Sequence, residues 1–149
     1  MTGWRDEARE RAWRTYIEAS VRLQTRLDEC LQHDTGLSLI DYHVLLLLSE
    51  ANDQRLRMGE LAGRLVFSPS RLTYQVSSME KRGLVLRERT PEDRRGTRAV
   101  LTAAGLHALR AAWPPHSRAI HDLFLDDLDD DEVECLGRIF SRVGARLGG

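Results

Sequence analysis

The sequence has few cysteines and lacks any long apolar run. Its two cysteines, Cys30 and Cys135, lie far apart, which excludes both the disulfide framework of a small secreted domain and a zinc site built from paired cysteines. No apolar stretch is long enough to span a bilayer, and the charged segment 1–14 does not resemble a secretory signal. We therefore expect a cytoplasmic protein with no membrane partner.

The common catalytic motifs are also missing. The chain has no Gly-x-Ser-x-Gly nucleophile elbow, no phosphate-binding glycine loop and no His-Glu-x-x-His motif. An enzyme would have to use His121 with Asp122, or Glu132 with Glu134, as an acid–base pair, but acidic residues are also typical of the first turn of a helix. We predict that the protein is not an enzyme and that it needs neither a cofactor nor a metal.

The formal net charge is −1, which by itself argues against nucleic acid as a partner. The charges are, however, unevenly distributed. Positions 55–98 contain eleven Lys and Arg residues but only five Asp and Glu residues, whereas positions 122–134 are strongly acidic. The central segment is therefore basic enough to contact phosphates, and the total charge hides it.

With 42% hydrophobic residues, the 149-residue chain is predicted to form a single domain, 1–149, with its own core. Apolar spacing and capping signals predict a mainly α-helical fold with a small β-hairpin. The predicted helices span residues 6–32, 39–50, 58–65 and 69–82, followed by a fifth helix capped by Thr102 and a last helix capped by Asp129. The predicted hairpin pairs 84–86 with 99–101 around a charged turn at 90–96, and Leu56 is expected to add one rung of strand.

Pro114 and Pro115 fall inside the predicted fifth helix. Proline lacks the N–H that an α-helix needs, and its ring clashes with the preceding turn. We expect the two prolines to interrupt or sharply kink this helix before it resumes at 120–125.

The helix predicted at 69–82 has two different faces. Leu72, Val76 and Met79 share one face, which we expect to be buried. The opposite face has short hydroxyls and cations, which suit a helix that enters the major groove of DNA: Ser70, Arg71, Tyr74, Ser77, Ser78 and Lys81. A short helix, a turn, this helix and a basic hairpin follow in the order of a winged helix-turn-helix. Two alternatives stay open, namely a solvated surface helix beside a charged turn and a winged helix that binds only proteins.

Several segments closely resemble the MarR family of bacterial regulators, the multiple-antibiotic-resistance type. They are MGELAGRL at 58–65, SPSRLT at 68–73, MEKRGLV at 79–85, DRR at 93–95 and VLTAAG at 100–105. The resemblance implies a winged helix-turn-helix lobe at 38–102 and dimerisation helices at 1–35 and 103–149. It also implies a homodimeric transcription regulator, a repressor that binds a pseudo-palindromic operator in double-stranded DNA and is released by a small-molecule effector.

The resemblance further assigns roles to individual residues. The amino-terminal half of the recognition helix would contact bases and phosphates through Ser68, Ser70, Arg71, Thr73, Tyr74 and Gln75. In the wing, Arg95 would enter the minor groove, Asp93 would orient it, and Arg94 and Arg98 would contact phosphates. An arginine on a thin hairpin can read a narrow minor groove because the negative potential there is enhanced.

Family members often bind a small aromatic or anionic effector between their lobes. The residues of this chain that could line such a space are Trp13, Tyr16, His33, Tyr42, His43 and Trp113. Ordinary core packing is the alternative explanation for these side chains.

Cys30 raises two further alternatives. It could sense oxidants, but its acidic neighbours Asp28 and Glu29 disfavour a reactive thiolate and so favour a structural thiol. Cys30 and His33, with His43 or His107, could also form a zinc site, but two ligands at this spacing often occur by chance.

Overall fold

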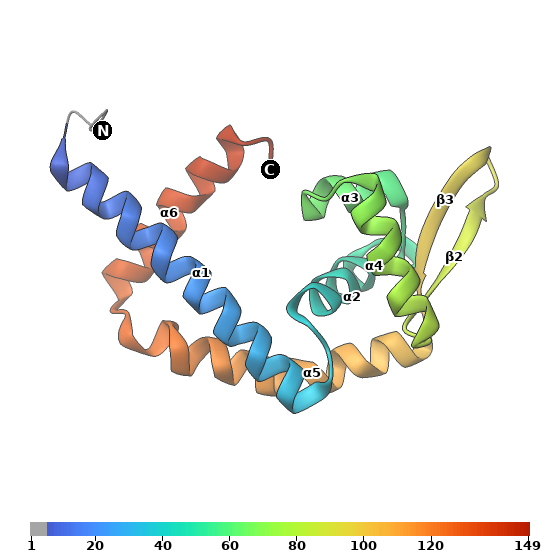
Figure 1. Cartoon of the computed structure of the whole chain (residues 1–149), viewed down its shortest axis with the longest axis horizontal. Helices are drawn as coiled ribbons and strands as arrows, with labels where there is room; N and C mark the ends of the chain where they lie inside the picture. The colour runs from blue at the N-terminus through green and yellow to red at the C-terminus, as the bar shows by residue number, and fades with distance from the viewer. Residues whose placement is uncertain (1–5) are drawn as a thin grey trace.

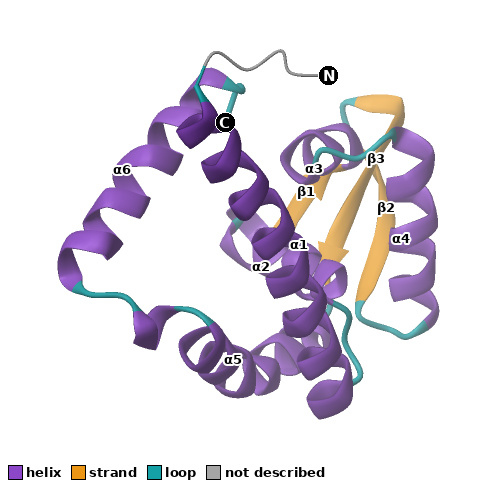
Figure 2. Ribbon diagram, turned by 60° about the vertical axis from the view of Figure 1, so that its left-hand side comes forward, coloured by secondary structure: helices purple, strands orange, loops and turns teal. Residues whose placement is uncertain are grey.

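The computed structural model describes residues 6–149. This part of the chain contains six α-helices and a small antiparallel sheet (Figures 1 and 2). The elements are α1 (Glu7–Thr35), α2 (Leu39–Glu50), η1 (Asn52–Gln54), β1 (Arg55–Arg57), α3 (Met58–Leu65), α4 (Pro69–Lys81), β2 (Val85–Thr90), β3 (Asp93–Leu101), α5 (Ala103–Leu123), η2 (Leu125–Asp127) and α6 (Asp130–Arg146). The predicted mainly α-helical fold with a small hairpin is confirmed.

Side-chain caps define the starts of most helices. Ser38 Oγ accepts from the Asp41 N–H and the Asp41 carboxylate accepts from the Ser38 N–H, both at 3.0 Å, which is the predicted capping box of α2. Asp129 and Glu132 form an equivalent box at the start of α6. Thr102 caps α5 as predicted. These starts were predictable because each cap joins residues only a few positions apart.

The three strands form one antiparallel sheet in the order β1, β3, β2. Leu56 pairs with Ala99, so the strand predicted at Leu56 is present, but it is longer than the single rung expected, because Arg55 and Arg57 also pair with β3. The predicted turn across 90–96 is wrong, because β3 already begins at Asp93, opposite Thr90, and only two residues separate the strands. The hydroxyl of Thr90 donates to the carbonyl oxygen of Asp93 at 2.9 Å, and this hydrogen bond closes the hairpin early.

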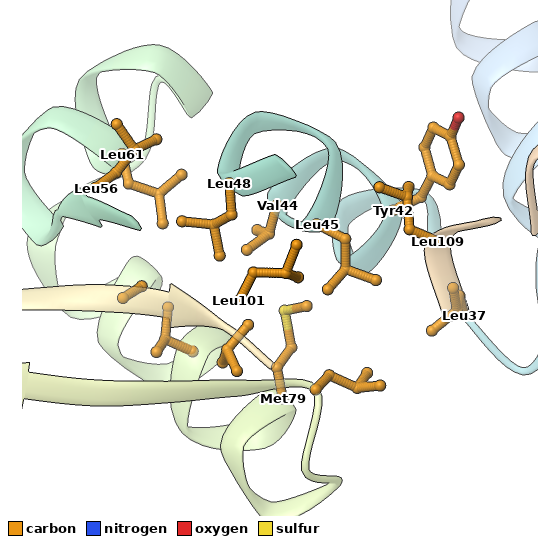
Figure 3. Packing of buried hydrophobic residues seen from close by; sticks show 14 of the residues in the cluster. Leu37, Tyr42, Val44, Leu45, Leu48, Leu56, Leu61, Met79, Leu101 and Leu109 are labelled. Carbon is orange, nitrogen blue, oxygen red and sulfur yellow. The ribbon is translucent and has the colours of Figure 1, made fainter. Parts of the chain in front are cut away.

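The hydrophobic core lies between α2, α4 and one face of the sheet (Figure 3). Leu45 of α2, Val76 of α4 and Val85 of β2 have no exposed surface. Leu109 and Ala112 extend the same core onto α5. Burial of each large aliphatic side chain contributes about 1.5–3 kcal/mol to the stability of the folded chain. Packing therefore fixes α4 and the hairpin against the same core.

The prediction that Pro114 and Pro115 interrupt the fifth helix is wrong. Helix α5 is one continuous element from Ala103 to Leu123 with both prolines inside it (Figure 1). Packing on both sides of the prolines explains this result, since Ala112 is fully buried and His116 is only 5% exposed. Two adjacent prolines remove two consecutive N–H donors, and tertiary contacts with α1 and α2 offset that loss.

Helices α1 and α6 lie on one side of the molecule, and α2, α3, α4 and the sheet lie on the other (Figure 1). Helix α5 runs along both groups and contacts α1 and α2. Both α1 and α6 carry exposed apolar side chains: Trp13, Tyr16, Ile17 and Val21 on α1, and Val133, Ile139, Phe140 and Val143 on α6. Within residues 6–149, no helix combines the length and apolar character needed to cross a membrane.

Candidate nucleic-acid interface

A tight turn joins α3 to α4. Val66 ends α3 in the left-handed region, with φ of 56° and ψ of 45°, and the Phe67 N–H donates back to the Ala62 carbonyl oxygen at 2.9 Å. Ser68 then caps α4 by accepting from the Arg71 N–H at 3.2 Å, and Pro69 occupies the first helical position. The turn thus sets the angle between the two helices of a helix-turn-helix.

Helix α4 has the two faces that its periodicity predicts. Leu72 is 1% exposed, and Val76 and Met79 are fully buried. Tyr74 is 79% exposed on the outer face. Ser68, Ser70, Arg71 and Thr73 are also exposed near the start of the helix. The outer face thus offers hydroxyls, a phenol and a cation to a partner.

Two side chains of this region are held by contacts within the protein. The Arg71 guanidinium lies 3.8 Å above the centre of the Phe67 ring, a cation–π contact that restrains its position. Thr73 Oγ1 donates to the Pro69 carbonyl oxygen at 2.9 Å. Both side chains remain exposed, so they are restrained without being withdrawn from the surface.

Gln75 lies differently from the other predicted contacts. It is half-buried, and its Nε2 donates to Asp41 Oδ1 of α2 at 2.6 Å. Arg82 donates to the same oxygen from the other end of α4, with a distance of 2.7 Å between Nη2 and Oδ1. Sequence reasoning missed this role of Asp41 and Arg82. The available signal was a carboxylate in the first turn of α2, just before its apolar run 44–48.

Hydrogen bonds join the residues at the tip of the hairpin to one another. Asp93 Oδ1 accepts from the backbone N–H of Arg95 at 2.9 Å, so the carboxylate fixes the backbone from which the Arg95 side chain projects. Gly96 packs directly against the hydroxyl of Thr90, where any Cβ would clash. The Arg95 side chain itself is exposed. The Arg94 side chain lies outside the described part of the structure.

Several arginines of the basic segment are neutralised within the sheet. Arg98 Nε lies 2.6 Å from Glu88 Oε1, and Arg55 Nη1 lies 2.7 Å from the same oxygen. The hydrogen bond from Arg98, together with the charge of Arg55, holds the pKa of Glu88 below its ordinary value. Arg98, predicted to contact phosphate, is therefore engaged with Glu88.

Other cationic side chains of the basic segment 55–98 remain exposed and could contact a partner. Among the described side chains, Arg71, Lys81, Arg89 and Arg95 are exposed and form no ion pair. A shallow hollow of about 340 Å³ lies on the outer face of α4, lined by Tyr74, Ser77, Ser78, Lys81 and Arg82. Arg64 of α3 is also exposed and without an ion pair among the described residues, so the exposed positive charge lies on α3, α4 and the hairpin, which share one core.

The six residues predicted to line an effector space do not share one location. Tyr16 packs between Trp13 and Phe140 of α6, with ring centres 6.1 and 5.2 Å away. Tyr42 packs against His116 of α5 at 4.5 Å, with His43 beside it at 6.2 Å.

The two remaining residues of this set, His33 and Trp113, are exposed. His33 pairs with Asp34 at 2.9 Å, and Trp113 is 55% exposed. Cys30 is half-buried and lines a separate polar cavity with Asp34 and Arg118. In residues 6–149, no three His, Cys, Asp or Glu side chains gather closely enough to hold a metal ion.

A helix-turn-helix with an exposed hydroxyl-rich and cationic second helix, followed by a two-stranded wing, defines a winged helix-turn-helix regulator. The sequence model of the MarR family matches residues 35–96. The chain is 31% identical to the HTH-type transcriptional regulator MhqR of Bacillus subtilis over 75% of either protein. It is 28% identical to the HTH-type transcriptional repressor YetL of the same organism, over 81% of this chain and 76% of that protein.

Solved structures agree with these sequence matches. AbsC, a MarR family transcriptional regulator from Streptomyces coelicolor, has 36% identity and a TM-score of 0.91 over 99% of both chains. Sco3205, a MarR family regulator from the same organism solved in complex with DNA, has 37% identity and a TM-score of 0.93 over 100% of this chain and 93% of that one. The chain belongs to the MarR family of transcriptional regulators and is not an enzyme.

Proposed function

We propose that the protein is a transcriptional repressor that binds a pseudo-palindromic operator as a homodimer. The observation that carries this proposal is the exposed hydroxyl and cationic face of α4 beside a wing that presents Arg95. In such an arrangement α4 reads base edges in the major groove while the wing reaches the adjacent minor groove. The complex of Sco3205 with DNA supports the same assignment. We further propose that the protein acts in the bacterial cytoplasm.

The proposed dimer interface is formed by α1 and α6, which lie in the predicted dimerisation regions 1–35 and 103–149. Val21 of α1 is 60% exposed and Val133 of α6 is 46% exposed, and similar side chains continue along both helices. Contiguous apolar surface of this kind on a folded protein marks an association site. A two-fold dimer would place two copies of α4 on half-sites one helical turn apart, about 34 Å along the DNA.

We also propose that a small aromatic effector releases the repressor from DNA. An apolar cavity of about 690 Å³ lies between α1, the end of α5 and α6, lined in part by Tyr16, Leu23, Phe124 and Phe140. Its volume lies within the range of sites that enclose small molecules. An effector bound there acts only if it favours one spacing of the two recognition helices over the other.

The experiment that tests the proposal is selection of DNA fragments by the purified protein. The expected result is enrichment of an inverted repeat, binding that weakens steeply as salt rises, and a hydrodynamic mass of two chains. A winged helix that binds only proteins would enrich no sequence and would retain weak, unselective DNA binding at most. Absence of enrichment from fragmented bacterial DNA would therefore contradict the proposal.

A further inference from the structure

Asp41 is a buried carboxylate in the first turn of α2, with 4% of its surface exposed. Its Oδ2 accepts from the Ser38 N–H at 3.0 Å, which completes the capping box. Its Oδ1 accepts from Gln75 Nε2 at 2.6 Å and from Arg82 Nη2 at 2.7 Å. Both oxygens are therefore used, and two of the three donors come from α4.

The energetics of this site favour a fixed geometry. Burial of a carboxylate costs several kcal/mol unless it is paired and hydrogen-bonded. Burial opposes the charge of Asp41, but the hydrogen bonds from Arg82, Ser38 and Gln75 outweigh it and hold the pKa of the carboxyl below its ordinary value. The charged form is thus the one that the fold stabilises, and it persists at neutral pH.

Gln75 and Arg82 lie seven positions apart, which corresponds to two turns, or about 10 Å along the axis of α4. Binding of both to one oxygen of α2 restrains the tilt of α4 and its rotation about its own axis. The apolar contacts of Leu72, Val76 and Met79 hold α4 to the core, but such contacts are not directional. Hydrogen bonds are directional, so they select one orientation among those that the core permits.

The anchor point on α2 is itself held from another helix. Asp28 of α1 accepts from the Leu39 N–H through Oδ1 at 2.8 Å, and its Oδ2 accepts from Gln32 Nε2 at 2.6 Å. Leu39 is the first residue of α2, in the same turn as Asp41. The turn that holds α4 is therefore fixed to α1 and does not move independently.

We propose that Asp41 is a positioning residue for operator recognition, which sets the orientation of α4 through Gln75 and Arg82. This inference rests on the proposed function, in which α4 reads DNA. It also assigns Gln75 a role inside the protein in place of a direct contact with DNA. The consequence is that loss of the Asp41 contacts lowers sequence discrimination more than it lowers general attraction to DNA.

The test uses the ratio of affinities for the selected operator and for random-sequence DNA, measured by anisotropy on the full-length protein. Asp41→Asn keeps the size of the side chain, but an amide cannot accept from Ser38, Gln75 and Arg82 together. We expect this ratio to fall about tenfold, which corresponds to the loss of one such hydrogen bond. Binding to random DNA should hold or tighten, because the cations remain and Arg82 is released.

A compensating variant distinguishes orientation from general damage. Gln75→Glu alone places two carboxylates together and should also lower the ratio. In the double variant Asp41→Asn with Gln75→Glu, the new amide donates to the new carboxylate, which also accepts from Arg82, so the ratio should recover to within about threefold of the wild type. Asp53→Asn removes an equal charge at an exposed position and serves as the matched control.

The measured affinity ratios either support or contradict the positioning role of Asp41. An unchanged affinity ratio in Asp41→Asn would overturn the inference. So would a double variant whose ratio is no higher than that of either single variant, provided that circular dichroism shows all three variants to be folded. If Asp41→Asn does not fold, Gln75→Ala replaces it, because that half-buried side chain is removed without leaving a charge unpaired. If the wild-type protein enriches no operator, the proposed function fails instead, which is a separate result.

Discussion

Replacement of Arg95 by alanine should weaken operator binding without unfolding the protein. The side chain is exposed and makes no ion pair among the described residues. Its structural contribution is the backbone N–H that donates to Asp93 Oδ1 at 2.9 Å, and alanine retains that group. The change therefore removes only the guanidinium that the wing presents.

The magnitude follows from the geometry of the proposed dimer. A hydrogen bond from a charged group contributes about 1.5 kcal/mol or more. Two wings give about 3 kcal/mol for the dimer, which at about 1.4 kcal/mol per tenfold is a weakening of roughly a hundredfold. The dependence of log affinity on log salt should become shallower by about 1.8, because each of the two guanidinium groups in the minor groove displaces condensed counterions, at about 0.9 for each charge neutralised.

The assay is an anisotropy titration of the selected operator, repeated at several salt concentrations, with unfolding midpoints measured beside it. Arg110→Ala is the matched control, because it removes the same charge from an exposed α5 side chain that forms no ion pair among the described residues. Affinity within about twofold of the wild type, or equal weakening in the control, would refute the assignment of Arg95 to the minor groove.

Two further predictions concern stability, measured by urea unfolding at a fixed protein concentration. Gly105→Ala should destabilise the protein by about 1–3 kcal/mol, because the new methyl group would collide with the Leu84 carbonyl oxygen. Gly63→Ala is the control and should cost no stability, because a Cβ there meets nothing within 4 Å. Equal stability of the two variants would contradict this prediction. Burial, aided by the charge of His43, lowers the pKa of His116, whose Nδ1 is buried without a hydrogen-bond partner among the described residues. The unfolded chain therefore binds a proton more readily than the native chain. The stability that neutral His116 allows is present above the unfolded-state pKa of about 6.5, and it is lost as the pH falls from there through the lowered pKa of the folded chain. His116→Phe should lose less stability than the wild type between pH 7.5 and pH 5.5; an identical loss would show that His116 does not titrate in this way.

Local signals determined which features could be predicted from the sequence. The capping box of Ser38 and Asp41, the Ser68 cap and the two faces of α4 involve residues at most a few positions apart. Backbone geometry fixes such relations wherever a helix forms, so periodicity and capping residues were enough to place the recognition helix and its exposed face.

Long-range contacts decided the rest. The same Asp41 accepts from residues 34 and 41 positions away, and no local pattern indicates which distant donor a buried carboxylate will bind. Arg98 was predicted to contact phosphate, but strand pairing brings it beside Glu88.

The continuous helix through Pro114 and Pro115 has the same kind of cause, since local propensity opposes it and packing against α1 and α2 overrides that propensity. The sequence by itself therefore determined the class of regulator, the recognition helix and the basic wing, because these depend on local order along the chain. Only the tertiary structure decided which charged side chains remain exposed for the proposed contact with DNA and which hold the proposed recognition helix, because those pairings depend on residues that folding alone brings together.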